Sequence, residues 1–244
     1  MSRNKLIYGT HSILEALDAG KEIDKIFIRR GLKTDETQQV ARIARERVIP
    51  MQYVPSEKLD RLTTKNHQGI VAFIAEIEYT SLEQLIPIIY EEGRAPFFVI
   101  LDGITDVRNF GAIARTAECT GVDAIIIPDK GSVSVTGDAI KTSAGALHRV
   151  AVCRVSSISH TIRMLQDNGI KVVTASEKAN TTYTEESLQY PCAIVMGSEE
   201  VGPSEDTIRL SDSLIRIPQV GSIGSLNVSV AAGVILYECL RQNS

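Results

Sequence analysis

Polar residues gather in a glycine-rich turn near the end of the chain. An apolar run at residues 214–217 stops at Pro218, and glycine and serine residues follow as far as Ser225. From Ser225 onward apolar residues recur with a helical period, and the Ser225 hydroxyl suits an N-cap. Backbone amides in such a turn can approach a ligand closely, and Asn227 stands beside them. The pattern predicts either a ligand-binding loop or an ordinary turn between a strand and a helix.

A second pair of candidate residues, Asn109 and Arg115, follows an apolar run at residues 97–101. The sequence after that run lacks the GxGxxG pattern of dinucleotide-binding folds, so a cofactor should bind elsewhere. Arg115 follows Asn109 by about one and a half helical turns. Gly111, four residues before Arg115, should leave that helix face open for a ligand. The alternative is that Arg115 is a surface charge and Asn109 an N-cap.

Three later strand ends carry polar or glycine-bearing loops, at residues 174–175, 197–199 and 218–225. These loops are candidate ligand-binding segments. Glu199, in the second of them, is a candidate site residue. Its alternative role is that of a carboxylate near the start of a helix, where negative charge is favourable.

Three stretches of the chain resemble the ordered motifs of the SpoU, or TrmH-like, RNA 2′-O-methyltransferases. They are DGITDVRNFGAIARTAECTG at 102–121, VMGSEEVGP at 195–203 and SLNVSVAAG at 225–233. Two further segments, YGTHSILEAL at 8–17 and HQGIVA at 67–72, resemble the branch that methylates a guanosine in 23S ribosomal RNA. The resemblance implies methyl transfer from S-adenosylmethionine to a ribose 2′-OH.

The resemblance also implies roles for particular residues. S-adenosylmethionine would be held largely by backbone groups of Gly197, Ile217 and Leu226, with Thr174 as a further candidate. The catalytic set would be Arg115, Asn109, Glu199, Ser225 and Asn227. Arginine keeps its proton well above neutral pH, so we expect Arg115 to fix the 2′-OH or the adjacent phosphate. The other four would hold Arg115 and the target ribose in register.

The predicted fold class is α/β, in two domains. From residue 96 to 244, apolar runs separated by helical patterns predict a parallel sheet; they lie at 97–101, 124–127, 150–155, 171–175, 193–196 and 214–217. Topology rules alone give an unknotted, doubly wound sheet, whereas the resemblance implies a SPOUT domain with a trefoil knot. Residues 1–76 alternate short strands and helices, and the resemblance implies an L30e-like substrate-binding domain. Residues 77–95, acidic and containing Pro87, are interpreted as a linker.

The distribution of charge points to RNA contacts in the first domain. Residues 1–75 carry 13 Lys and Arg against 9 Asp and Glu, although the whole chain has a net charge of −4. Arg29 and Arg30 follow a predicted strand, and His67 lies in a family segment where it would support the fold or touch RNA. These three residues are the RNA-binding candidates.

Other features of the sequence indicate the cellular environment and the oligomeric state of the protein. The four cysteines are scattered without a CxxC pair, so we expect a reduced cytoplasmic environment and no zinc site. The sequence contains no signal peptide and no membrane-length apolar run. Residues 226–240 are apolar nearly all round, which predicts a homodimer through this helix. Two alternatives stay open: the same chemistry on tRNA or another rRNA site, or a catalytically silent RNA-binding protein of ribosome assembly.

Overall fold

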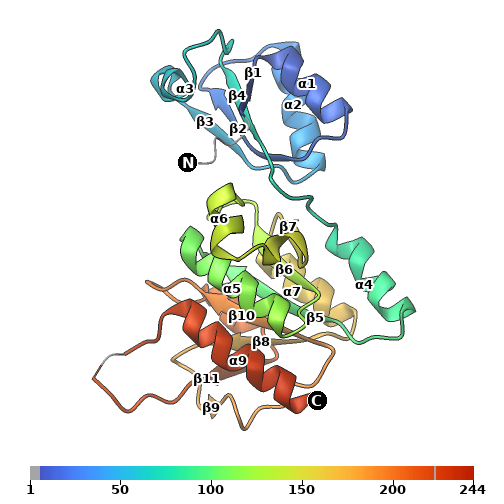
Figure 1. The fold of residues 1–244 in the computed structure, drawn as a ribbon, viewed down its shortest axis with the longest axis vertical. Coiled ribbons are helices and arrows are strands. Elements are labelled where there is room, and N and C mark those ends of the chain that lie inside the picture. The colour runs from blue at the N-terminus through green and yellow to red at the C-terminus, as the bar shows by residue number, and fades with distance from the viewer. Residues whose placement is uncertain (1–5, 223) are drawn as a thin grey trace. The chain divides into compact units, whose positions relative to one another are not determined.

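The computed structural model of the chain describes residues 6–222 and 224–244 (Figure 1). The chain divides into two compact units. Unit 1 holds the described residues up to Glu78 together with Ser134–Asp138, and unit 2 holds Tyr79–Val133 and Ala139–Ser244. Each unit is described by itself.

Unit 1 is a four-stranded sheet in the order β1-β4-β2-β3. The strands are β1 (Leu6–Tyr8), β2 (Ile23–Arg29), β3 (Met51–Val54) and β4 (Ile70–Ile74). Strand β3 pairs with β2 in parallel, whereas β4 pairs antiparallel with both β1 and β2.

The helices of unit 1 are α1 (Thr10–Asp18), α2 (Asp35–Glu46) and α3 (Ser56–Leu62). Alternation along β2 separates two cores, because successive strand side chains point to opposite faces. Ile26 and Ile28 are buried with α1 and α2, whereas Phe27 is buried with Leu59 of α3. The small α/β arrangement expected for this part of the chain is therefore present.

Unit 2 is built on a seven-stranded sheet in which every pair is parallel, in the order β7-β6-β5-β10-β8-β11-β9. Its strands are β5 (Phe97–Asp102), β6 (Ala124–Pro128), β7 (Ala151–Val155), β8 (Lys171–Ala175), β9 (Thr181–Thr182), β10 (Cys192–Gly197) and β11 (Ser213–Arg216). The six predicted strands of this sheet are all present, and the two-residue β9 was not predicted. The α/β class with a parallel sheet is confirmed.

Helices cover both faces of this sheet, which explains why its strands read as continuous apolar runs. The helical elements are α4 (Leu82–Glu91), α5 (Val107–Cys119), α6 (Gly137–Thr142), the 3₁₀ turn η1 (Ala146–His148), α7 (Ile158–Asp167), α8 (Glu205–Leu210) and α9 (Val228–Gln242). Side chains of α4 and α7 pack with Phe98 and Ile100 of β5 on one face. Helices α5 and α9 lie against each other, and α9 contacts β10 (Figure 1).

The segment interpreted as a linker holds helix α4, and that helix belongs to the core of unit 2. Leu82, Ile86 and Ile89 are each no more than 2 % exposed, within the apolar cluster formed with β5 and α7. Just before the helix, the Thr80 amide donates to the Val152 carbonyl at 2.9 Å. Residues 79–91 are therefore packed structure, because their apolar side chains repeat at helical spacing on one face.

Candidate active site

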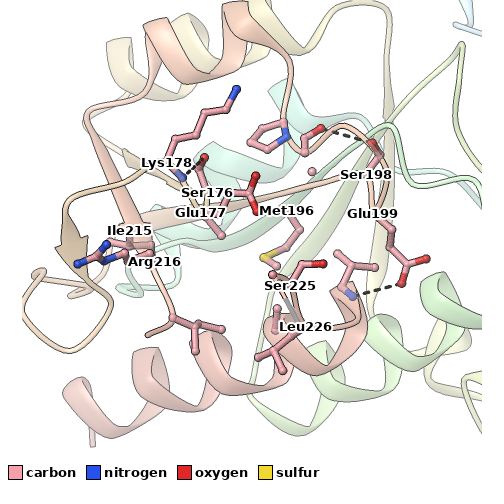
Figure 2. Close-up of a pocket in the computed structure, with 18 of the residues that line it drawn as sticks. Ser176, Glu177, Lys178, Met196, Ser198, Glu199, Ile215, Arg216, Ser225 and Leu226 are labelled. Atoms are coloured by element: carbon pink, nitrogen blue, oxygen red, sulfur yellow. Dashed lines mark hydrogen bonds between the residues drawn. The ribbon is translucent and has the colours of Figure 1, made fainter. Parts of the chain in front are cut away.

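A cavity of about 700 Å³ lies at the carboxyl ends of three neighbouring strands, β10, β8 and β11. Figure 2 shows its lining, which comes from the loops after these strands, from the turn before α9 and from α9 itself. Ligands of open parallel sheets bind beyond the carboxyl ends of the strands. The cavity therefore lies where the topology favours a ligand, and its volume suits a small molecule.

The wall of this cavity combines apolar side chains with free backbone groups. Met196, Ile215 and Ile235 contribute apolar surface. In the turn, the backbones of residues 218–222 and 224–226 form no hydrogen bond with another described residue. Backbone donors and acceptors that the fold leaves unused are available to a bound polar molecule.

Three of the four predicted cofactor residues line this cavity. Gly197 ends β10, Ile217 follows β11, and Leu226 lies just before α9. Thr174 is not among the described lining residues, although its neighbour Ala175 is. The Thr174 side chain is fully buried, and its Oγ1 lies 2.6 Å from Ser211 Oγ.

At Gly197 the backbone of the following loop leaves no space for a side chain. A Cβ added there would lie 2.0 Å from the Pro203 nitrogen and 2.2 Å from the Gly202 carbonyl carbon. Both contacts are with backbone, which cannot rotate away as a flexible side chain can. The loop at 198–203 therefore folds back over the end of β10 because residue 197 has no side chain.

We expect Gly197→Ala to lower the thermal stability of the protein, because overpacking against a fixed backbone costs about 1–3 kcal/mol or more. Gly221→Ala is the matched control, since a Cβ at Gly221 meets nothing within 4 Å. Thermal unfolding of both variants checks the prediction. A Gly197→Ala protein that melts with wild type would contradict the close approach.

Three predicted catalytic residues meet at the start of α9. The Asn227 amide Nδ2 donates to Asn109 Oδ1 at 3.0 Å and to Glu199 Oε1 at 2.5 Å. Glu199 Oε1 also accepts from the Val228 amide at 3.4 Å. Residues separated by more than a hundred positions thus form one polar cluster, and its member Glu199 also lines the cavity. The helix-start role of Glu199 is present, since its carboxylate lies at the start of α9, whereas its role in the reaction stays a prediction.

The starts of α5 and α9 fix two members of this cluster. Asp106, and not Asn109, caps α5, because its carboxylate accepts from the amides of Arg108 and Asn109 at 2.8 and 3.0 Å. Asn227, and not Ser225, caps α9, where its Oδ1 accepts from the Ser229 amide at 3.0 Å. The predicted N-cap at Ser225 is therefore wrong by two residues.

The Asp106 cap has an electrostatic consequence. The Asn109 amide, followed by the Arg108 amide and guanidinium, holds the pKa of this carboxyl below its usual value. A lowered folded-state pKa means that the carboxylate stabilises the helix start above the ordinary aspartate pKa. That contribution is lost as the pH falls through the lowered value.

Arg115 and Ser225 do not join the cluster. Arg115 is exposed on α5, and its side chain forms no hydrogen bond or ion pair with another described residue. It shares a helix stripe with Arg108 and Cys119, at intervals of seven and four residues. Ser225 is exposed and lines the cavity. Within one chain, the basic side chain expected to act on RNA faces outward.

The expectation that Gly111 leaves a helix face open for a ligand is wrong. A Cβ at Gly111 would lie 2.7 Å from Thr142 Cβ and 3.0 Å from the Ser143 amide nitrogen. Residues 142–143 therefore pack directly on α5. Ser143, in the turn between α6 and η1, is fully buried.

The three predicted RNA-binding residues have different environments in unit 1. Arg30 lines a second cavity beside α2, whereas Arg29 does not line it and lies next to Gly69. Both ring nitrogens of His67 are used: Nδ1 accepts from the Gly69 amide at 3.0 Å, and Nε2 lies 2.9 Å from Asp60 Oδ1. This bonding ties the loop before β4 to α3, which is the supporting role considered for His67.

Several residues of the site were not predicted from the sequence. Ser176, Glu177 and Lys178 follow β8 and line the cavity, as does Arg216 at the end of β11 (Figure 2). Their position after apolar runs was a usable signal. The Asp106 cap could also have been found, since an aspartate three residues before Asn109 is a common helix start.

Within residues 6–222 and 224–244, no group of three or more His, Cys, Asp or Glu side chains is placed to hold a metal ion. In the same residues, no helix combines the length and apolar character needed to cross a membrane.

Comparisons with known proteins match both units. A family model described as the SpoU rRNA Methylase family matches residues 96–237, which is more than half of the chain. A second model, described as RNA 2′-O ribose methyltransferase substrate binding, matches residues 6–80. A Staphylococcus saprophyticus protein assigned to the TrmH family of tRNA/rRNA methyltransferases is 37% identical over 239 residues, covering 98% of this chain and 96% of that protein.

Solved structures support the same assignment. An rRNA methyltransferase from Sinorhizobium meliloti with bound AdoMet has a TM-score of 0.61 and 25% identity, covering 97% of this chain and 86% of that one. The SpoU methyltransferase AviRb from Streptomyces viridochromogenes, in complex with AdoMet, has a TM-score of 0.61 and 24% identity, covering 97% and 89%, and shows the shared fold. The chain belongs to the SpoU rRNA methylase family of RNA methyltransferases.

Proposed function

We propose that this chain transfers a methyl group from S-adenosylmethionine to the ribose 2′-OH of a guanosine in 23S rRNA. The observation that carries the proposal is the cluster of Asn109, Glu199 and Asn227, one member of which lines the cavity at the strand ends. The segments at 8–17 and 67–72 favour the 23S rRNA guanosine over other targets.

S-adenosylmethionine is the cofactor, since related SpoU and rRNA methyltransferases were crystallised with it. The cavity fits it, with apolar surface for a planar base and unused backbone groups for its polar parts. When bound, it supplies an electrophilic methyl group on a sulfonium. Gly197, Ile217 and Leu226 would hold it through backbone contacts, and Glu177 and Lys178 stand in the same wall.

The residues of the chain would position the acceptor. Asn227 is oriented at both ends, because Nδ2 donates within the cluster while Oδ1 accepts from Ser229. A cluster held this way can fix a ribose without reorganising, which favours transfer. Arg115 would hold the 2′-OH or the adjacent phosphate by charge-assisted hydrogen bonds, and the phosphate or a water would take the proton.

A homodimer would complete the site. Arg115 faces outward in one chain, while Val230 and Tyr237 leave an apolar stripe exposed on α9, which packs against α5. Pairing of two chains through this stripe would cover it and bring Arg115 to the partner's cavity.

We also propose the trefoil knot, the L30e-like fold of unit 1 and a cytoplasmic location, in which the four cysteines stay free.

The test of this function is methyl transfer to separated RNAs. RNA from cells lacking the enzyme would be split into 23S rRNA, 16S rRNA and tRNA, and each would be incubated with the protein and radiolabelled S-adenosylmethionine. We expect label in 23S rRNA alone. Label in tRNA or 16S rRNA would show that the substrate is that RNA and not 23S rRNA. No label in any RNA would favour a catalytically silent protein of ribosome assembly.

A further inference from the structure

A second cavity, of about 950 Å³, lies wholly within unit 1. Its floor is formed by Ile28 of β2 and Tyr53 of β3, which are register partners in the sheet. One wall is a face of α2, with Gln38, Arg42 and Arg45 at intervals of four and three residues. The turn after β2, from Arg30 to Lys33, closes one end. This groove, lined by residues 28, 30–33, 37–39, 41–42, 45 and 53, has no role in the site of unit 2.

The charge of the groove is of one sign. Four cations line it, and none of its described lining residues is a carboxylate; the cations are Arg30, Lys33, Arg42 and Arg45. Within the described residues, none of the four forms an ion pair. All four are exposed. Cations without carboxylate partners attract phosphates and release the counterions condensed on a nucleic acid.

An aromatic ring lies among these cations. Tyr53 is 48 % exposed, because β3 is the edge strand of the sheet and α2 does not cover its side chain. The Arg30 Nε donates to the Tyr53 backbone carbonyl at 3.4 Å, which links one of these cations to the strand that carries the ring. An exposed ring among cations is the arrangement that binds unpaired nucleotides, since the base stacks while the phosphates meet the charges.

We infer that this groove binds an unpaired nucleotide of the RNA substrate, with its base on Tyr53 and its phosphates on Arg42, Arg45 and Lys33. The inference rests on the proposed function, because it names the form of RNA that unit 1 recognises. Base stacking requires a splayed base, which single-stranded loops and bulges provide and a continuous duplex does not. The amides of Gln38 and Gln39 line the same groove and can hydrogen-bond a base edge.

The test compares binding of short single-stranded and duplex RNA of the same sequence to the full chain, by fluorescence anisotropy over a range of salt. We expect Tyr53→Ala to weaken single-strand binding about tenfold, because stacking on an aromatic side chain contributes this much per base. Tyr53→Phe should bind within about twofold of wild type, since the ring is kept. Thermal unfolding of each variant checks that unit 1 is intact.

The cations are tested through the salt dependence. The double variant Arg42→Gln with Arg45→Gln should lower the slope of log affinity against log salt by about 1.4, as expected for two lost phosphate contacts on a single strand. Lys21→Gln with Arg61→Gln is the matched control, because both residues are exposed, lie outside the groove and carry the same charge. We expect this pair to leave the slope unchanged.

Four results would overturn the inference. They are wild-type affinity in Tyr53→Ala, an equal loss in the control pair, tighter binding of duplex than of single strands, and displacement of RNA by an equal concentration of oligoglutamate. Methyl transfer by the wild-type protein is measured in parallel. If the wild-type protein transfers methyl groups and the groove variants bind RNA as wild type does, the role of the groove is rejected while the proposed function stands. If the wild-type protein transfers no methyl group, the proposed function is rejected.

Discussion

Arg115→Ala is expected to bind S-adenosylmethionine normally while methyl transfer to RNA falls by about 100- to 1,000-fold, the usual cost of removing one transition-state donor. Arg115 is exposed on α5 and is not among the described residues lining the cavity, so its loss should leave the cofactor contacts intact. Alanine is a good helix former, and α5 should keep its structure. Calorimetry for the cofactor and a methyl-transfer assay for activity measure the two effects separately.

Arg108→Ala is the control for this prediction. Arg108 lies on the same stripe of α5, is 87 % exposed, and has only a long ion pair of 3.8 Å with Asp106. If general attraction of RNA to α5 were the cause, both variants would lose activity together. Near-normal turnover of Arg115→Ala, or an equal loss in Arg108→Ala, would contradict the role given to Arg115.

Val230→Glu is expected to convert a homodimer into a monomer and to remove methyl transfer at the same time. Val230 and Tyr237 are 53 % and 54 % exposed and lie seven residues apart, on one stripe of α9. A carboxylate buried there without a partner costs about 3–5 kcal/mol, which weakens pairing by more than ~100-fold. If Arg115 serves the partner's cavity, the monomer has no complete site. Light scattering and the methyl-transfer assay give the two readouts.

Ile88→Glu controls for the addition of a charge to an exposed apolar position. Ile88 lies on α4 and is 49 % exposed. The Ile88→Glu substitution should leave the mass of the oligomer and the activity unchanged, because α4 is not part of the expected interface. An active wild-type protein with the single-chain mass of 26.6 kDa at micromolar concentration would exclude the dimer.

The sheet of unit 2 was predictable from the sequence because its strands are buried on both faces. Residues such as Phe98, Ile100 and Val195 have no exposed surface, so the pattern is a continuous apolar run with little ambiguity. The short strands β1 and β9 have three and two residues, too few for any periodicity. The apolar run of β2 was predictable as a strand. That its side chains belong to two separate cores was not, since Phe27 and Ile28 pack on opposite faces of the sheet.

The sequence could name candidate residues for the site, but it could not show how they are arranged. Ser225 and Asn227 are both good N-caps, and the choice between them depends on Glu199, whose carboxylate accepts from the Asn227 side chain and the Val228 amide. The contact of Gly111 with Thr142 and the outward position of Arg115 also depend on tertiary packing. A local sequence pattern does not show which distant segment of the chain will pack against a given helix face.

The measurement that tests the central claim most directly is the chemical position of the transferred methyl group. RNA methylated by the purified protein would be digested to nucleosides and analysed by mass spectrometry, with Arg115→Ala as the comparison. The proposed function predicts 2′-O-methylguanosine in the wild-type sample, and the role proposed for Arg115 predicts a level lower by about 100-fold or more in the variant. A methyl group on a base nitrogen or carbon, with the ribose unmodified, would contradict the account.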